Sequence, residues 1–299
     1  MKEGWKTRAI GRHLVDLPAD ARTIEQYKFN KVPIEPLSDI RTRERFDKMV
    51  SEQERSLRAS KHKNGGSMFI ERVAHANGSL TLISWAASYS ESIYRFDTYF
   101  QSGSRFLKYA GHVSPSLRES ALSECDELSR EWREIPLGEA PSGVGYVVDD
   151  TILVDRDMNL ESWRMAIRLA GKPDVSFEIA SYAQDKVSPS LRERAGGALA
   201  GLLGKVAGLS RLRNRARPVG PIEADEILLS GTQAGKRGYG FKWEGPGKAG
   251  SLAKPNLNVT LEVRESAYTT NKESFASDEE ALELWDAVVD SIRLRPGSV

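Results

Sequence analysis

The chain has 299 residues, and its 43 lysines and arginines nearly balance its 42 aspartates and glutamates. A chain of this length usually forms two domains, and the balanced charge argues against a dedicated nucleic-acid-binding protein. Its single cysteine excludes an internal disulfide framework.

The N-terminal segment MKEGWKTRAIGRHLVDLPAD lacks the apolar stretch of a signal peptide. The most apolar window, residues 195–209, is too short to span a bilayer and is interrupted by Lys205 and by several glycines. We therefore expect no stable membrane insertion.

Helical and strand periodicities alternate along the chain. Helices are predicted at residues 38–60, at 117–132, and at 282–292 after a capping box from Ser277 to Glu280. Alternating apolar residues predict strands with one buried face at 94–100, 163–169, 175–179 and 257–263. Runs of antiparallel strands separated by single helices indicate an α+β fold.

A loop rich in proline and glycine divides the patterned halves. The stretch from Ile135 to Gly145, IPLGEAPSGVG, is the best candidate for a domain boundary. We expect an N-terminal domain over residues 1–137 and a C-terminal domain over 138–299, each with an antiparallel sheet packed by helices.

The heptapeptide VSPSLRE occurs twice, at residues 113–119 and 187–193. Proline after serine suits the first turn of a helix, and serine with the glutamate three residues later can form a capping box. The flanking sequences differ, so we interpret the repeat as one helix start used twice rather than as an internal duplication.

Catalytic signatures are absent from the sequence. It contains no nucleophile elbow, no phosphate-binding loop and no paired histidines with metal-ligand spacing. Cys125 lies on an apolar helix face and is expected to be a core residue. The carboxylates Asp149, Asp150, Asp155 and Asp157 form the best candidate for a hydrolase site, although such clusters more often form a hairpin turn. We expect no catalytic residue, no metal and no cofactor.

The segment KRGYGFKWE, residues 236–244, resembles half of an RNA-recognition signature, but no partner aromatic strand is evident. An alternative is an envelope-associated lipid or glycan binder that uses Tyr239 and Trp243 on an exposed strand. A second notable segment is the basic run RLRNRARP, residues 211–218. It is typical of a solvated helix end, and it is also a candidate docking patch for an acidic partner.

Several segments together resemble a known family. GRHLVDLPAD is similar to the opening motif of the immunity proteins that neutralise phospholipase effectors of the type VI secretion system. GYVVDDTILVD resembles the first hairpin of that family's C-terminal domain, and ESWRMAIRLAGKPDVSFEIASY resembles its next two strands. GYGFKWEGPG with PNLNVTLEV resembles its aromatic strand pair, and SDEEALELWDAVVDSIRLRPG its closing helix. The resemblance covers nearly the whole chain and is most specific from Gly143 to Gly297.

The resemblance implies a binding protein and not an enzyme. Its partner would be a cognate secreted lipase, which both domains would clamp so that the lid over the active site cannot open. It also implies a periplasmic protein, although the export signal usual in the family is absent from this sequence. The family carries no short motif that assigns interface residues. We expect them in loops and segments that combine charge with flexibility: Lys61, His62, Lys63, Arg211, Arg213, Arg215, Arg217 and Lys248.

Overall fold

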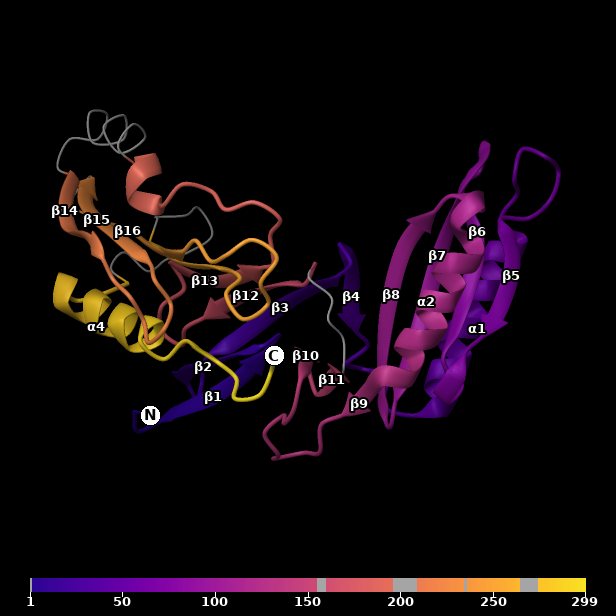
Figure 1. The fold of residues 1–299 in the computed structure, drawn as a ribbon, viewed down its shortest axis with the longest axis horizontal. Coiled ribbons are helices and arrows are strands. Elements are labelled where there is room, and N and C mark those ends of the chain that lie inside the picture. The colour runs from indigo at the N-terminus through magenta and orange to yellow at the C-terminus, as the bar shows by residue number, and fades with distance from the viewer. Residues whose placement is uncertain (1, 155–159, 196–208, 234–235, 264–273) are drawn as a thin grey trace. The chain divides into compact units, whose positions relative to one another are not determined.

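The computed structural model describes residues 2–154, 160–195, 209–233, 236–263 and 274–299. It is an α+β protein built from antiparallel strand pairs, as predicted. The chain forms two compact units (Figure 1): unit 1 contains residues 1–26 and 158–299, and unit 2 contains residues 27–157. The division falls inside strand β3, Arg22–Phe29.

Unit 2 contains a sheet with the strand order β4-β8-β7-β6-β5 and one helix on each of its faces (Figure 1). Its elements, in chain order, are β4 (Val32–Pro36), α1 (Arg43–Ala59), β5 (Phe69–Ala74), η1 (Ala76–Gly78), β6 (Leu80–Ala87), β7 (Ser90–Ser102), β8 (Arg105–Val113), η2 (Pro115–Leu117), α2 (Arg118–Glu131), β9 (Trp132–Glu134), β10 (Gly145–Val148) and β11 (Thr151–Val154).

Successive side chains of β7 point to opposite faces of the sheet, where they contact the two helices. Tyr99 packs with Phe46 of α1, while Thr98 on the opposite face lies 3.3 Å from the Sγ atom of Cys125 in α2. Burial raises the pKa of the Cys125 thiol, although its hydrogen bonds to Thr98 and Thr81 act in the opposite direction. Cys125 is therefore a core residue, as its helical position predicted.

Strands β9, β11 and β10 form a small sheet beside this core. Asp149 and Asp150 occupy the tight turn between β10 and β11, where Asp149 has a left-handed φ of 52°. Asp150 pairs with Arg105 at 2.6 Å. The hairpin interpretation of these two carboxylates is thus confirmed, whereas Asp155 and Asp157 lie outside the described residues.

Unit 1 contains the strand order β14-β15-β16-β17-β13-β12, with β3 next to β12, and a separate small sheet β1-β2-β18. Its remaining elements are β1 (Trp5–Ile10), β2 (His13–Pro18), β12 (Ser162–Arg168), β13 (Val175–Tyr182), β14 (Leu209–Ala216), β15 (Asp225–Gln233), β16 (Lys236–Gly245), β17 (Asn256–Val263), α4 (Asp278–Val289) and β18 (Arg293–Leu294).

Helix α4 covers one face of the larger sheet of unit 1. The Trp285 ring is fully buried between Phe177 of β13 and Phe241 of β16. The predicted cap is present, because the Ser277 side chain accepts a hydrogen bond from the Glu280 amide. The Glu280 carboxylate, however, accepts from the amide of Ala276 rather than from that of Ser277.

The N-terminal hairpin β1-β2 belongs to unit 1 because it is tied to the C-terminal end of the chain. Strand β2 pairs with β18, and the buried Arg12 donates two hydrogen bonds of 2.6 and 2.8 Å to the Glu161 carboxylate. Arg12 also donates to the carbonyl of Ser298. The compact units therefore do not follow the predicted division at residues 137 and 138, which falls within unit 2.

The two VSPSLRE copies start helices in different ways. At the second copy, Ser190 and Glu193 form the predicted reciprocal capping box. At the first copy, the short helix η2 leads into α2, and Leu117 at the N-cap contributes no side-chain bond.

Within the described residues, no helix has the length and apolar character needed to cross a membrane.

Candidate functional site

The basic run at residues 211–218 forms edge strand β14 and its continuation, not a helix end as predicted. Strand geometry places alternate side chains on one face. Arg215 thereby lies directly opposite Glu226 of β15, and Arg213 lies opposite Leu228 on the face that α4 covers. A register shift between Arg211 and Arg213 separates Arg211 from this set.

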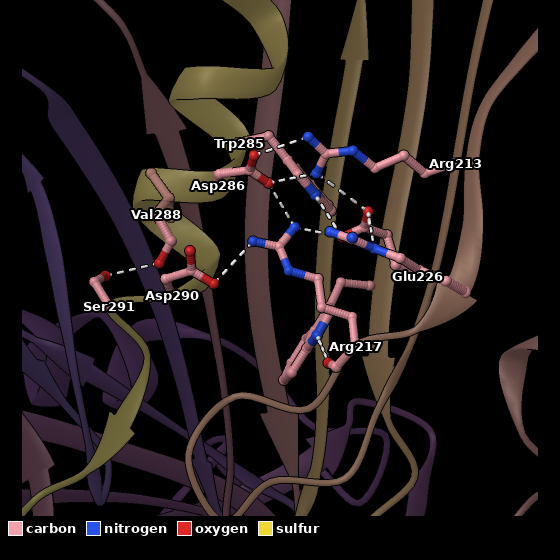
Figure 2. A network of polar contacts seen from close by, with 10 residues as sticks. Arg213, Arg217, Glu226, Trp285, Asp286, Val288, Asp290 and Ser291 are labelled. Carbon is pink, nitrogen blue, oxygen red and sulfur yellow. Dashed lines mark hydrogen bonds and ion pairs between the residues drawn. The ribbon is translucent and has the colours of Figure 1, made fainter.

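Two of these arginines enter a network with α4 (Figure 2). Arg213 makes a bidentate pair with Asp286, with N–O distances of 2.6 and 2.9 Å. Arg217 contacts the buried Glu226, and it reaches Asp286 at 2.7 Å and Asp290 at 2.8 Å. The Trp285 indole also donates to Glu226 at 3.5 Å. The network therefore links β14 and β15 to one face of the helix.

Burial and ion pairing shift the pKa values of Arg217 and Asp286 in opposite directions. Burial lowers the pKa of Arg217, but hydrogen bonds to Glu226 and Asp290 outweigh it and the pKa is raised. Burial raises the pKa of Asp286, yet Arg213 and Arg217 hold it below its usual value. Arg213, Arg217 and Asp286 are thus charged at neutral pH. Both arginines are already engaged by partners within unit 1.

Other predicted binding residues are available at the surface of unit 1. Arg211 is exposed, and Arg215 is 55 % exposed with its Nε atom 3.7 Å from Glu226. Lys248 lies exposed in the loop after β16. That loop turns at Gly247 with a φ of +69°, where a Cβ atom would come within 2.3 Å of the Pro255 carbonyl oxygen.

The predicted binding loop of unit 2 also contains both exposed and buried residues. Lys61 and Lys63 are exposed, whereas the His62 side chain is fully buried and its ring stacks on Trp85 with a centroid distance of 5.4 Å. The loop contacts the turn between β6 and β7, where Tyr89 is 73 % exposed. Tyr89 was not predicted. Its one sequence signal is an aromatic residue between Ser88 and Ser90, at the junction of two strand patterns.

The aromatic strand β16 faces the core. Tyr239, Phe241 and Trp243 are at most 5 % exposed, and Tyr239 packs edge-on against Phe275. The alternative of a lipid or glycan binder with Tyr239 and Trp243 on an exposed strand is therefore wrong. Base stacking on this strand is excluded for the same reason.

The described residues also bear on catalysis. Among them, no group of three or more His, Cys, Asp or Glu side chains is arranged to hold a metal ion. Asp150 is paired with Arg105 in its hairpin turn, and Cys125 is buried with a raised pKa. Asp150 and Cys125 therefore both have structural roles within unit 2.

The comparisons with known proteins decide the family. Residues 139–297 match the model of the C-terminal domain of Tle cognate immunity protein 4. The solved structure of a Tle4–Tli4 complex matches with 34 % identity and a TM-score of 0.92 over 100 % of both chains. The chain belongs to this family of immunity proteins.

Further family structures agree with this assignment. The apo immunity protein TplEi of the type VI secretion system from Pseudomonas aeruginosa is 34 % identical, with a TM-score of 0.91 over 99 % of both chains. The same protein complexed with an "L" peptide is 33 % identical, with a TM-score of 0.86 over 99 % of this chain and 100 % of that one. No curated protein sequence matches the chain. The family domain begins at residue 139, beside the predicted boundary, although the compact units are divided elsewhere.

Proposed function

We propose that this chain binds a phospholipase effector of the type VI secretion system and inhibits it, which protects the cell from self or sibling intoxication. One observation carries the proposal: the match to the Tle4–Tli4 complex extends over the full length of both chains at 34 % identity. Both units, and not one shared module, therefore support the same role. We propose that it acts in the periplasm, which its resemblance to the immunity family supports.

The proposed mode of action is binding and not catalysis. Each unit contributes contacts to the effector, so that the two units together act as a clamp that blocks opening of the lid. Inhibition of this kind requires only that the chain binds the closed effector more tightly than the open one. Two linked contact patches also strengthen binding, because the second contact forms within a complex that the first has already joined.

The proposed contact residues are those whose charges lie at the surface: Lys61 and Lys63 in unit 2, and Arg211, Arg215 and Lys248 in unit 1. His62, Arg213 and Arg217 were predicted with them, but their internal contacts favour a role in shaping the two units. Basic side chains at the edge of an interface chiefly accelerate association with an acidic partner.

The experiment is a lipid-hydrolysis assay with the phospholipase encoded beside the gene for this chain. At concentrations about 100-fold above the dissociation constant, an equimolar amount of the chain should suppress hydrolysis by more than about tenfold. An unrelated lipase should keep its activity, and the chain alone should hydrolyse no ester. Undiminished hydrolysis by the cognate enzyme would refute the proposed function.

Charge reversal in each unit tests the clamp. The pair Lys61→Glu and Lys63→Glu in unit 2, and the pair Arg211→Glu and Arg215→Glu in unit 1, should each slow association and weaken its salt dependence. The combined variant should bind more weakly than either pair. Arg45→Glu with Lys48→Glu, on the exposed surface of α1, is the matched control. An effect confined to one unit would contradict the two-unit clamp.

A further inference from the structure

Two loops of unit 2, residues 61–66 and 88–91, are joined by hydrogen bonds into one surface feature, which we call the tip. The Lys63 amide donates to the Ser88 carbonyl at 2.8 Å, and the Asn64 side chain donates to Glu91 at 2.7 Å. Within the first loop, the Gly66 amide donates to the Asn64 side chain at 2.9 Å. The contacts between the loops thus join segments that lie as much as 27 positions apart in sequence.

Packed rings connect the first loop of the tip to strands β6 and β7. The buried His62 stacks on Trp85 of β6, and Trp85 packs on Tyr94 of β7 with a centroid distance of 5.0 Å. A ring nitrogen of His62 also lies 3.3 Å from the Ser90 carbonyl oxygen. These contacts hold the two loops of the tip together in the absence of a partner. Such contacts reduce the ordering that binding requires, which lowers the entropic cost of association.

The outer surface of the tip combines one large ring with two cations. Tyr89 is 73 % exposed, and Lys61 and Lys63 are exposed in the first loop, where the Lys63 amide contacts the residue before Tyr89. Tyrosine is enriched among the few interface residues that carry most of the binding free energy, since it buries a large ring and loses little side-chain freedom. The fold does not bury this ring, and the hydrogen bonds and packed rings of the tip suit an anchor.

We propose that Tyr89 anchors the tip in an apolar pocket of the effector, and that Lys61 and Lys63 face acidic groups at the rim of that pocket. This inference rests on the proposed function and adds its main contact in unit 2. A protein is favoured over an anionic membrane because the solved structure that this chain matches over its full length is a protein complex. Glu91, 49 % exposed, also belongs to the tip and would be repelled by lipid phosphates. Two copies of the tip would bring like-charged lysines together.

The test measures the affinity of the purified chain for the cognate phospholipase by calorimetry. Tyr89→Ala should weaken binding by more than about tenfold, within the range of interface anchors. Tyr89→Phe keeps the ring and should bind within about threefold of the parent, because the apolar ring supplies most of the buried area. All variants should unfold at the parental temperature, since Tyr89 is largely exposed.

Leu137→Ala is the matched control, because Leu137 is 95 % exposed in another loop of unit 2. It follows Glu134, which accepts a hydrogen bond from Ser104 in the turn at the opposite end of β7 from Tyr89. This variant should bind like the parent. An equal loss for Leu137→Ala, or binding of Tyr89→Ala within about twofold of the parent, would overturn the anchor.

Two further arms separate the other outcomes. If the unaltered chain fails to bind the phospholipase, the proposed function fails and not the anchor alone. Sedimentation with vesicles containing anionic lipid tests the membrane, and analytical ultracentrifugation tests self-association. Tyr89→Ala could weaken binding to vesicles or to a second copy while leaving binding to the phospholipase unchanged. That result would overturn the effector as the occupant of the tip.

Discussion

Two arginines of the basic run offer a matched test of whether the run serves the fold or the partner. Arg215 and Arg217 are two residues apart and both approach Glu226, yet their side chains are 55 % and 8 % exposed. Replacing each in turn by glutamine removes the same charge from an exposed and from a buried position. We expect the buried substitution to destabilise unit 1 far more than the exposed one.

The magnitudes follow from the contacts. Removing one partner of a buried ion pair costs about 3–5 kcal/mol, because the other charge stays buried and uncompensated. After Arg217→Gln, the fully buried Glu226 keeps Arg213 at 3.4 Å and the Trp285 indole at 3.5 Å, so the lower end, about 3 kcal/mol, applies. For Arg215→Gln, an exposed pair at 3.7 Å is worth less than about 1 kcal/mol.

Differential scanning calorimetry measures the difference. In a unit of roughly 170 residues, about 3 kcal/mol lowers Tm by about 6–12 °C, and the exposed variant should shift it by less than about 4 °C. Below the unfolding transition, Arg217→Gln should still bind the phospholipase like the parent. Equal Tm shifts for the two variants would refute the reasoning, and weakened binding by folded Arg217→Gln would return Arg217 to the interface.

Two other predictions concern pH and proteolysis. Burial, then the nearby Arg12 charge, lowers the pKa of His13 from 6.5 to about 4, so its contribution to stability is complete above pH 6.5 and is lost as the pH falls toward 4. Urea unfolding should therefore show a free energy of unfolding about 2 kcal/mol lower at pH 5 than at pH 7, and His13→Gln should abolish this difference. The same difference in that variant would contradict the assignment to His13. Limited proteolysis should cut the exposed loop around Leu137, but the two fragments should co-elute on gel filtration, because β2 stays paired with β18 and Arg12 with Glu161. Separate elution of two folded fragments would instead support a division at residue 137.

The spacing of apolar residues predicted much of the fold, because it indicates which face of a single helix or strand is buried. The strand pattern at residues 257–263 became β17, which pairs with β13 and β16, and the Ser277 cap starts α4. The assignment of residues 1–26 to unit 1 carried no such signal. It depends on pairing between β2 and β18, which lie near opposite ends of the chain, and on the Arg12–Glu161 contact across 149 positions.

The basic run was misinterpreted because its composition was weighed before its period. Arginine occupies every second position from Arg211 to Arg217, which is the repeat of a strand and not of a helix. The carboxylates that pair with these arginines come from β15 and α4, up to 73 positions away, so charge alone made the run resemble a docking patch. A burial pattern that appears only in the folded chain decided which arginines remain exposed.

The motif that first suggested the family is itself part of the fold. In GRHLVDLPAD, Arg12 and His13 are each 3 % exposed, and Arg12 binds Glu161 and the carbonyl of Ser298. An arginine buried in this way tolerates few replacements, because a lysine cannot reproduce its bidentate geometry. The buried side chains of this motif thus serve the fold of unit 1. We therefore expect the determinants of effector choice among exposed residues, and we propose Tyr89 and Lys63 as two of them because the fold does not bury their side chains.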